Sequence, residues 1–382
     1  MAAIEQNLTP DESVLSSIFP EVTGLGPTSY HIISNTRNTC TFSIHHKTKL
    51  SYPKDILIRL ETSSLAQIAA IQSLAFAQLP DLVPPVLDVG TAISADGKKV
   101  SYYVTPYLSD TILLEDVWDT LDKANQEELM DSVVHAVEKL QELDLSKVKP
   151  GLALKDVYPQ SGEIRVGNPR IGFFTSIEQF LRRVLQAETV PCRISEIDDG
   201  IVLESDEEIG RVELSRKDLD NLLNEVVFCH NDLEARNILA KQTEGKNSHF
   251  RLAAIIDWEM AGFYPFAYEY SLKDTALGLS NQSFSWYSLF KQRTYRLLPH
   301  VECNMKLIKA LGLIDESKKR SIPNNVGVRF QAKWRDREQI ERSSKFYGGW
   351  VRKPDVAGHR PFTKDDQKVL EIEILQELGL LT

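Results

Sequence analysis

The spacing of hydrophobic positions changes along the chain from an alternating to a helical pattern. In the N-terminal part, short runs alternate apolar and polar side chains between polar turns, a pattern typical of half-buried strands. Between the third and fourth runs, residues 64–79 carry apolar side chains at helical spacing, and this helix must end before Pro80 because proline cannot continue it. The predicted strands are 30–34, 40–45, 56–60, 86–90 and 100–105.

The rest of the chain is predicted to be mainly helical. Two short apolar runs, 226–228 and 252–256, suit buried strands. Residues 144–170 and 195–213 are expected to be loops. The second holds eight acidic side chains against one arginine, and we interpret it as a solvated loop rather than a cation site. Apolar residues at intervals of three and four predict helices over 127–143, 176–186, 218–224, 284–298 and 368–378.

These elements predict an α+β fold with a small β-rich N-terminal lobe and a larger, mainly helical C-terminal lobe. The first residues, 1–28, are expected to be a leader that contains a short helix over 11–18. The small lobe is expected to occupy 29–107 and the large lobe 108–382.

Composition and charge narrow the class of protein. The 382 residues are 42% hydrophobic and 26% charged, values typical of a globular chain. The net charge of −10 argues against binding to nucleic acid or to an anionic membrane surface, since both need a basic face. The four cysteines form no C-x-x-C pair, no apolar run reaches the ~18 residues of a membrane span, and no secretory signal is visible. We therefore expect a cytoplasmic protein, and the oligomeric state is not predicted.

Two segments place oxygen-bearing side chains next to predicted buried strands. His230, Asp232 and Asn237 follow one strand with the spacing H-x-D-x-x-x-x-N, and Asp257 ends another. Phosphoryl transfer from a nucleotide needs one carboxylate to orient the acceptor hydroxyl and take its proton. It also needs a second carboxylate and an amide oxygen to hold Mg²⁺. Asp232 and Asp257 can supply the two carboxylates and Asn237 the amide oxygen.

Each of these residues alone has a simpler explanation. Asp232 could cap a helix, Asn237 could occupy a turn, and Asp257 could be a buried structural acid. His230 is expected to be structural in either case, bonding to backbone so that the loop keeps its shape. The four together at this spacing are much more specific than any one of them.

The chain resembles the aminoglycoside phosphotransferase and choline kinase-like family over roughly residues 25–290. Weaker matches are Gly172-Phe173-Phe174 before a helix and the P-x-x-x-E stretch from Pro265 to Glu269. The specific matches, which are most similar to those of fungal-type members, are Asn231-Asp232-Leu233, Arg236-Asn237-Ile238-Leu239 and Ile256-Asp257-Trp258-Glu259.

The resemblance implies a two-lobed protein-kinase-like fold that binds ATP and Mg²⁺ and phosphorylates a hydroxyl group of a small molecule. The small lobe would bind the nucleotide, and the large lobe would carry catalysis and the acceptor. Asp232 would be the catalytic base, with His230 and Arg236 in the same catalytic loop. Asn237 and Asp257 would be the magnesium ligands. The adenine would meet the hinge between the lobes, formed by Thr105, Pro106, Tyr107 and Leu108.

The small lobe departs from the family pattern at its phosphate-binding positions. Arg59 stands where members carry lysine or often arginine; it could bind phosphate bidentately or be a surface strand residue. Gln67 stands where a helical glutamate would pair with it, so a hydrogen bond would replace the ion pair. The loop with Ser34, Asn35 and Asn38 lacks the usual glycines, and its side chains could bind phosphate or obstruct the approach of the backbone.

Acceptor recognition is the least defined part of the sequence. Glu234, Glu259 and Glu269 could favour a cationic acceptor, although a surface salt bridge for Glu234 and a buried cap for Glu269 are simpler. Two other functions remain open. One is a catalytically inactive kinase-like binding or scaffold protein, which Gln67 and the glycine-poor loop favour. The other is nucleotidyl transfer at the same metal site.

Overall fold

The computed structural model describes residues 7–20, 30–45, 52–143, 165–243, 249–343, 349–353, 360 and 362–381. These residues divide into two compact units. The small unit comprises the described residues up to Ile112 together with Ala253–Glu259, and the large unit comprises the remainder. The chain therefore passes from the first unit to the second after Ile112, a few residues beyond the expected boundary.

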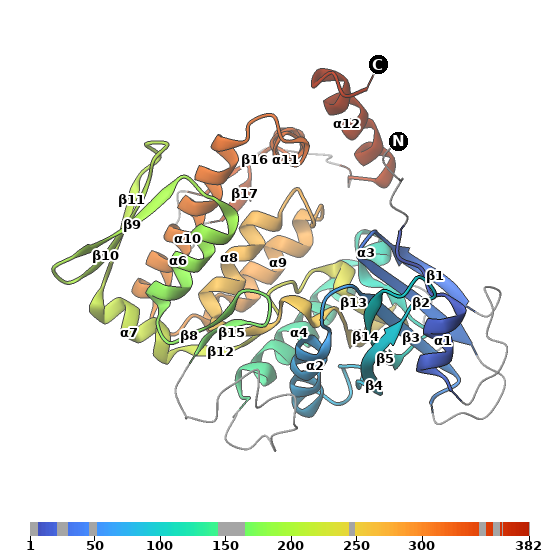
Figure 1. The fold of residues 1–382 in the computed structure, drawn as a ribbon. Coiled ribbons are helices and arrows are strands. Elements are labelled where there is room, and N and C mark those ends of the chain that lie inside the picture. Colours follow the sequence, from blue (N-terminus) through green and yellow to red (C-terminus); the bar gives the residue numbers. More distant parts are fainter. Residues whose placement is uncertain are drawn as a thin grey trace. The chain divides into compact units, whose positions relative to one another are not determined.

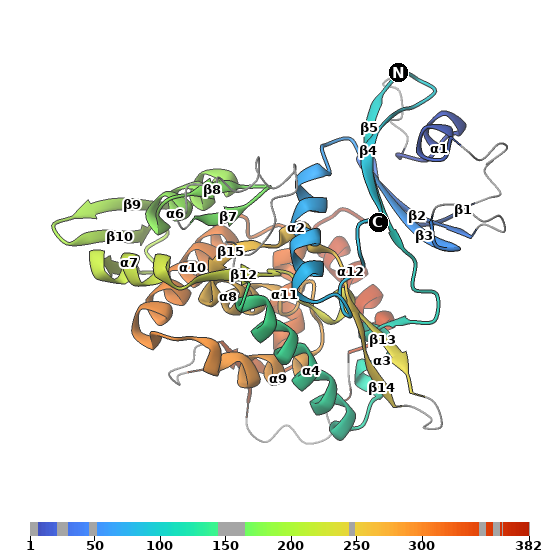
Figure 2. The ribbon, with the colours of Figure 1, turned by 90° about the horizontal axis from the view of Figure 1, so that it is seen from below.

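An antiparallel sheet forms the body of the small unit (Figure 2). Its strands lie in the order β1-β2-β3-β5-β4. Buried and less buried positions alternate along β2 and β3, so one face of the sheet carries the core residues of both strands. The strands are β1 (Tyr30–Asn35), β2 (Thr39–His45), β3 (Asp55–Glu61), β4 (Asp88–Ile93) and β5 (Lys99–Pro106).

Two helices complete the small unit. Helix α1 (Glu12–Ile18) begins at Asp11, whose side chain accepts a hydrogen bond from Val14 N at 2.9 Å. Its Leu15 packs into the core of the sheet, so this part of the expected leader belongs to the folded unit. Helix α2 (Ala66–Gln78) packs against Tyr103 of β5. The helix, its position before Pro80 and all five strands confirm the sequence-based predictions for this region.

The large unit is mainly helical, which confirms the predicted α+β class. Helix α10 packs against α8, and α8 contacts α9 (Figure 1). None of the helices in the described ranges combines the length and the apolar character needed to cross a bilayer. The helices are α3 (Leu114–Val117), α4 (Lys123–Gln141), α6 (Ile177–Glu188), α7 (Arg216–Asn224), α8 (Phe266–Ala276), α9 (Phe284–Thr294), α10 (Val301–Ser321), α11 (Val326–Arg337) and α12 (Lys364–Glu377).

Short strands connect these helices and carry the candidate motifs. One sheet has the order β12-β15-β7-β8, formed by Val226–Cys229, Gly262–Pro265, Val166–Asn168 and Gly172–Phe174. A second sheet has the order β14-β13-β6, formed by Phe250–Ile255, Ile238–Gln242 and Ile112–Leu113. The hairpin of β16 (Ile340–Arg342) and β17 (Trp350–Arg352) follows α11. The loop predicted over 144–170 lies largely outside the described residues, and β7 begins within it.

The prediction of a solvated loop over 195–213 is wrong. The segment forms an antiparallel sheet of β9 (Cys192–Ile197), β10 (Gly200–Ser205) and β11 (Arg211–Ser215), seen in Figure 1. Leu203 and Leu214 are fully buried, and both β10 and β11 contact α10. Five of the eight acidic side chains lie in the two turns of this sheet, at 198–199 and 206–208, whereas Glu204 and Glu213 stand next to the buried Leu203 and Leu214 on the strands.

The described residues after 292 belong to the large unit. Trp334 of α11 and Ile374 of α12 are fully buried and share a core with Leu277 and Tyr287. This region therefore packs into the helical core through its aromatic and aliphatic side chains.

The burial of Leu15 predicts that α1 stabilises the small unit. The substitution Leu15→Ala should lower the free energy of unfolding by about 2–5 kcal/mol, because it removes a side chain that is 1% exposed. The exposed neighbour Ser16→Ala serves as the control and should change it by no more than about 0.5 kcal/mol. Urea titration followed by circular dichroism measures both, and equal stability of the two variants would contradict the role of α1.

Candidate active site

The candidate catalytic loop begins where β12 ends at Cys229. Asn231 has a left-handed backbone conformation, with φ of 63°, which asparagine tolerates better than most residues. Its Nδ2 donates a hydrogen bond to Met260 O at 3.0 Å. After the turn at Asn231, Asp232 lies three residues before the short 3₁₀ helix Ala235–Asn237.

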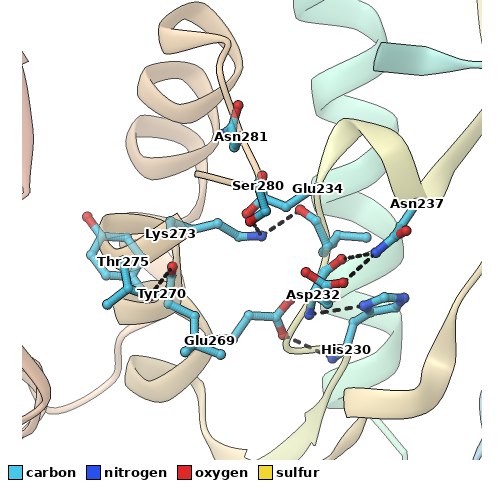
Figure 3. Close-up of polar contacts among 12 residues, drawn as sticks. His230, Asp232, Glu234, Asn237, Glu269, Tyr270, Lys273, Thr275, Ser280 and Asn281 are labelled. Atoms are coloured by element: carbon cyan, nitrogen blue, oxygen red, sulfur yellow. Dashed lines mark hydrogen bonds and ion pairs between the residues drawn. The ribbon is translucent and has the colours of Figure 1, made fainter. Parts of the chain in front are cut away.

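His230 takes part in two hydrogen bonds that hold the backbone of this loop. The ring Nδ1 of His230 accepts a hydrogen bond from Asp232 N at 3.2 Å. The backbone N–H of His230 donates to Glu269 Oε2 at 3.1 Å (Figure 3). The residue is completely buried. The described contacts of His230 thus join the backbone of the loop to Glu269.

The carboxylate of Asp232 is held by two side chains of its own loop. Oδ1 accepts from Arg236 Nη2 at 2.5 Å, and Oδ2 accepts from Asn237 Nδ2 at 2.8 Å. Arg236 is itself fixed through Nη1, which donates to Ser280 O at 2.6 Å. The Asp232 side chain is 24% exposed, so its oriented carboxylate can still meet a ligand.

Asn237 uses one end of its amide to hold the loop. Nδ2 donates to Asp232 O at 2.7 Å as well as to Oδ2, which assigns the other end of the amide as oxygen. Oδ1 is thus the atom that Asn237 could offer to a cation.

A buried ion pair lies directly behind Asp232. Lys273 Nζ is 2.9 Å from Glu234 Oε1 and donates to Leu233 O at 2.5 Å (Figure 3). The two side chains are 1% and 2% exposed. The sequence motifs do not include Lys273; its position four residues after Glu269 on a helix is the signal that could have indicated a charged neighbour.

Glu269 is the buried acceptor of a hydrogen bond from the backbone of the loop. It is 1% exposed, and burial raises the pKa of its carboxyl group, while Lys273 and the backbone N–H groups of the loop act in the opposite direction. Its hydrogen bond from His230 N is the contact expected of a buried cap, the simpler alternative to a residue that binds the acceptor.

A cavity of about 360 Å³ opens beside Asp232 in the large unit. Glu234 also lines it, whereas the other two candidate acceptor residues, Glu259 and Glu269, do not. Helices α6, α8 and α10 form its walls, with the side chains of Val184, Tyr268, Ser271, Leu272, Thr275, Leu311, Ile314, Asp315 and Lys318.

The small unit holds the second group of candidates. Asp257 follows β14 and, like Asn231, has a left-handed backbone, with φ of 64°. Arg59 Nη1 lies 3.2 Å from Asp257 Oδ1, and its Nη2 lies 2.6 Å from Glu61 Oε1 and contacts Glu259. Burial disfavours the charge of Arg59, but Tyr103 and the surrounding carboxylates raise the pKa of its guanidinium on balance.

The expected hydrogen bond between Gln67 and Arg59 is not formed. Gln67 is exposed on α2, and within the described residues Arg59 is bound by Glu61, Asp257 and Glu259. Glu61 was missed in the sequence, although it lies two residues after Arg59 and so on the same face of β3.

The expected phosphate loop is a short turn closed by its own bonds. Thr36 N donates to Thr39 O at 2.8 Å, and the Thr36 hydroxyl accepts from Asn38 N and Thr39 N. Ser34 and Asn38 are exposed, and Asn35 is half-buried at the end of β1.

The expected adenine-binding hinge lies at the end of β5. Thr105 is buried, whereas Tyr107 is 39% exposed. Tyr107 N donates to Asp55 O at 3.0 Å, and Leu108 O accepts from the Thr111 hydroxyl at 2.7 Å. Pro106, which has no N–H, pairs in register with Ile56 of β3.

In the described ranges, no three His, Cys, Asp or Glu side chains form a group that could hold a metal ion. The candidate ligands Asn237 and Asp257 belong to the large and small units respectively.

The model of the phosphotransferase enzyme family matches residues 53–272, more than half of the chain. No curated protein sequence matches the chain. Among solved structures, a point mutant of aminoglycoside 2′-phosphotransferase IIIa in complex with GDP is 13% identical, with 96% of this chain and 95% of that chain covered and a TM-score of 0.42. The ternary complex of APH(2″)-IIa with streptomycin and ATP is 12% identical, with 98% and 100% covered and a TM-score of 0.37. Such distant likenesses do not identify the acceptor.

The three carboxylates around Arg59 predict that its charge stabilises the small unit. The substitution Arg59→Met should lower the free energy of unfolding by about 1–3 kcal/mol, because it leaves Glu61, which is 3% exposed, without its cation. Arg59→Lys should lower the free energy of unfolding by less than Arg59→Met, because the lysine ammonium group replaces some of the hydrogen bonds of the guanidinium.

Thermal and urea unfolding measure these changes. Lys99→Met, which removes an exposed cation from β5 of the same sheet, is the matched control and should leave stability nearly unchanged. A stability of Arg59→Met equal to that of the control would contradict the role of this cluster.

Proposed function

The chain belongs to the phosphotransferase enzyme family, and on that premise we propose that it transfers the γ-phosphoryl group of ATP to a hydroxyl group of a small molecule. One observation carries the proposal: the carboxylate of Asp232 is oriented by Arg236 and Asn237 at the wall of a cavity large enough for a small acceptor. Family membership supports the transfer of phosphate, and this geometry supports Asp232 as the residue that activates the acceptor.

Asp232 acts as the base in this proposal. Its carboxylate accepts a hydrogen bond from the acceptor hydroxyl and takes the proton as the oxygen attacks the γ-phosphorus. A new P–O bond forms to the acceptor, the bond between the γ-phosphorus and the bridging oxygen breaks, and ADP leaves with that bond's electron pair. The products are a phosphate monoester, ADP and one proton, which Asp232 returns to solvent.

The loop residues support this role without taking the proton. Arg236 and Asn237 donate to different oxygens of Asp232, so the carboxylate cannot rotate freely. His230 receives the backbone N–H of Asp232 and thereby fixes its Cα. Such positioning lowers the entropy that is lost when acceptor and base align.

Asn237 and Asp257 are the proposed magnesium ligands. Oδ1 of Asn237 is an amide oxygen whose orientation is set by the two bonds of Nδ2, and Asp257 offers a carboxylate, so the donor set is hard and oxygen-only. A bound Mg²⁺ would neutralise charge on the nucleotide phosphates. We propose that Arg59, whose Nη1 lies 3.2 Å from Asp257 Oδ1, binds the nucleotide phosphates.

Two features of the small unit favour a second candidate function, that of a kinase-like binding protein. The Thr36–Thr39 turn is closed by its own hydrogen bonds, and the Arg59 guanidinium already contacts three carboxylates. A kinase-like binding protein without transfer activity would tolerate both features. ADP release by the Asp232 variant and stabilisation by Mg-ATP distinguish these functions, and the masses of the products distinguish phosphoryl from nucleotidyl transfer.

Loss of the proposed base should abolish turnover but spare nucleotide binding. The substitution Asp232→Asn keeps the size of the side chain and should lower the rate of ADP release from Mg-ATP, with water or added polyols as acceptor, by about 10²–10⁴-fold. Asp220→Asn, an exposed residue of α7, is the control and should leave the rate unchanged. Undiminished ADP release by the Asp232 variant would refute its assignment as base.

The proposed metal ligands predict stabilisation by nucleotide that depends on Mg²⁺. Mg-ATP at a hundred times its dissociation constant should raise the free energy of unfolding by about 2.7 kcal/mol, visible as an upward shift of Tm. Asp257→Asn and Asn237→Ala should each reduce this shift. Asparagine at 257 keeps the backbone conformation, because it tolerates the φ of 64° found there. The absence of any shift in the unmodified chain would favour the binding protein.

A further inference from the structure

A second cavity, of about 870 Å³, lies in the large unit apart from the cavity beside Asp232. Helix α10 lines both cavities, with different residues. The cavity beside Asp232 is lined by Leu311, Ile314, Asp315 and Lys318 of this helix. The second cavity is lined by Met305, Ile308, Lys309, Gly312, Leu313 and Glu316. It is therefore a separate site, and its volume lies within the roughly 300–1,000 Å³ found for small-molecule sites.

The walls of the second cavity are mainly apolar. Besides α10, the turn between β10 and β11 and the hairpin of β16 and β17 contribute to them. Trp350 of β17 is held in place by its Nε1, which donates to Asp274 O at 3.1 Å. The other apolar side chains of the lining are Ile209, Val212, Met305, Ile308 and Leu313. Such walls suit a ligand with an aliphatic body.

Gly312 leaves space on one wall of this cavity. It lies in the interior of the 21-residue helix α10, where glycine is less favourable than alanine because it loses more backbone freedom on folding. Apart from its neighbours along the helix, a Cβ atom at this position would meet no described atom within 4 Å. Close packing therefore does not require glycine here, whereas an open cavity benefits from it.

Two charged residues of the lining are already paired. Arg211 forms an ion pair with Glu213 of the same strand. Asp274, which is 4% exposed, accepts a hydrogen bond from Tyr287 Oη at 2.7 Å and lies 3.0 Å from Lys291 Nζ. A cationic ligand would have to compete with Lys291 for this carboxylate, so Asp274 does not favour a cation in the cavity.

The other charged residues of the lining leave an excess of positive charge. Arg342 is 3.5 Å from the Glu316 carboxylate and 3.9 Å from that of Asp274, both long distances for an ion pair. Lys309 is exposed and, in the part of the chain that the structure describes, has no ion pair or hydrogen bond. Burial lowers the pKa of the nearby Arg335 to about 10, and the charge of Arg342 adds to this effect against that of the surrounding carboxylates. An anion would relieve this excess.

We propose that the second cavity binds a small organic anion with an aliphatic body, of the kind represented by a medium-chain carboxylate. Its charged oxygens meet Lys309 and Arg342, which donate charge-assisted hydrogen bonds. Its body packs on the apolar walls beside Gly312. The site shares no lining residue with the proposed acceptor cavity and is independent of the proposed function.

Probes that differ in head group or in body test the inference by binding alone. We would titrate the full chain with octanoate, 1-octanol, octylammonium and acetate and follow ligand-observed NMR signals without nucleotide. Octanoate should bind about tenfold more tightly than 1-octanol, because its charged oxygens gain stronger hydrogen bonds. Octylammonium should bind more weakly than 1-octanol. Acetate, which lacks the aliphatic body, should bind at least about tenfold more weakly than octanoate.

A spectroscopic signature locates the bound probe. In a chain labelled with 5-fluorotryptophan, the variant Trp350→Phe assigns the ¹⁹F signal of Trp350, one of five tryptophans. Octanoate should shift this signal in a saturable manner, because Trp350 lines the cavity. A saturable shift confined to the other four signals would place the probe elsewhere and contradict the site.

Three variants connect binding to the named residues. Lys309→Gln and Arg342→Gln should each weaken the binding of octanoate about three- to tenfold and leave that of 1-octanol unchanged. Gly312→Leu places a side chain in the cavity and should weaken the binding of both probes. Arg320→Gln, which removes an exposed cation of α10 outside the lining, is the matched control and should bind octanoate like the unmodified chain.

Circular dichroism and Tm identify a variant that does not fold, and the remaining variants then decide. Gly312→Leu should fold, since leucine favours a helix and its Cβ meets no described atom beyond its helical neighbours. The inference is overturned by equal binding of octanoate and 1-octanol, by tightest binding of octylammonium, or by the absence of saturable octanoate binding. An unchanged affinity for octanoate in every folded variant would overturn it as well.

Discussion

One buried ammonium group organises the candidate catalytic loop. Lys273 Nζ binds Leu233 O and Glu234 Oε1 and lies 4.7 Å from the centroid of the Phe290 ring. A charge in this environment is tolerated because a carboxylate and a carbonyl oxygen compensate it, and removing either would leave the charge unpaired. Since Leu233 and Glu234 directly follow Asp232, the same bonds that keep Lys273 buried restrict the proposed base.

Backbone conformation imposes a second constraint on the chemistry. Asn231 and Asp257 are both left-handed, with φ of 63° and 64°, and one precedes the proposed base while the other is a proposed metal ligand. A residue other than glycine adopts this conformation at a cost, which asparagine and aspartate bear best. At both motifs the left-handed position is thus occupied by a residue type that tolerates it, so the turn forms without glycine.

The apolar pattern of the sequence predicts the elements whose buried face is entirely apolar. It does not predict elements in which polar residues are buried as well. Strands β2 and β3 alternate cleanly, so they were found. Helix α10 was missed because polar residues interrupt its apolar pattern. Asn304 and Ser317 are completely buried there, bonded to Glu225 and Ser205. The catalytic motif was readable because its members lie within eight positions, whereas Lys273 reaches Glu234 from 39 residues away.

Arg59 shows why the partners of a charged side chain depend on the fold. A guanidinium carries five donors in a planar fork, so one arginine can bind several carboxylates where an ammonium group would hold fewer. Glu61 comes from the same strand, and Asp257 and Glu259 arrive on the segment after β14. Arg59 is thus fixed without a glutamate on α2, which leaves Gln67 exposed. Three carboxylates from two segments of the small unit therefore share the donors of one guanidinium.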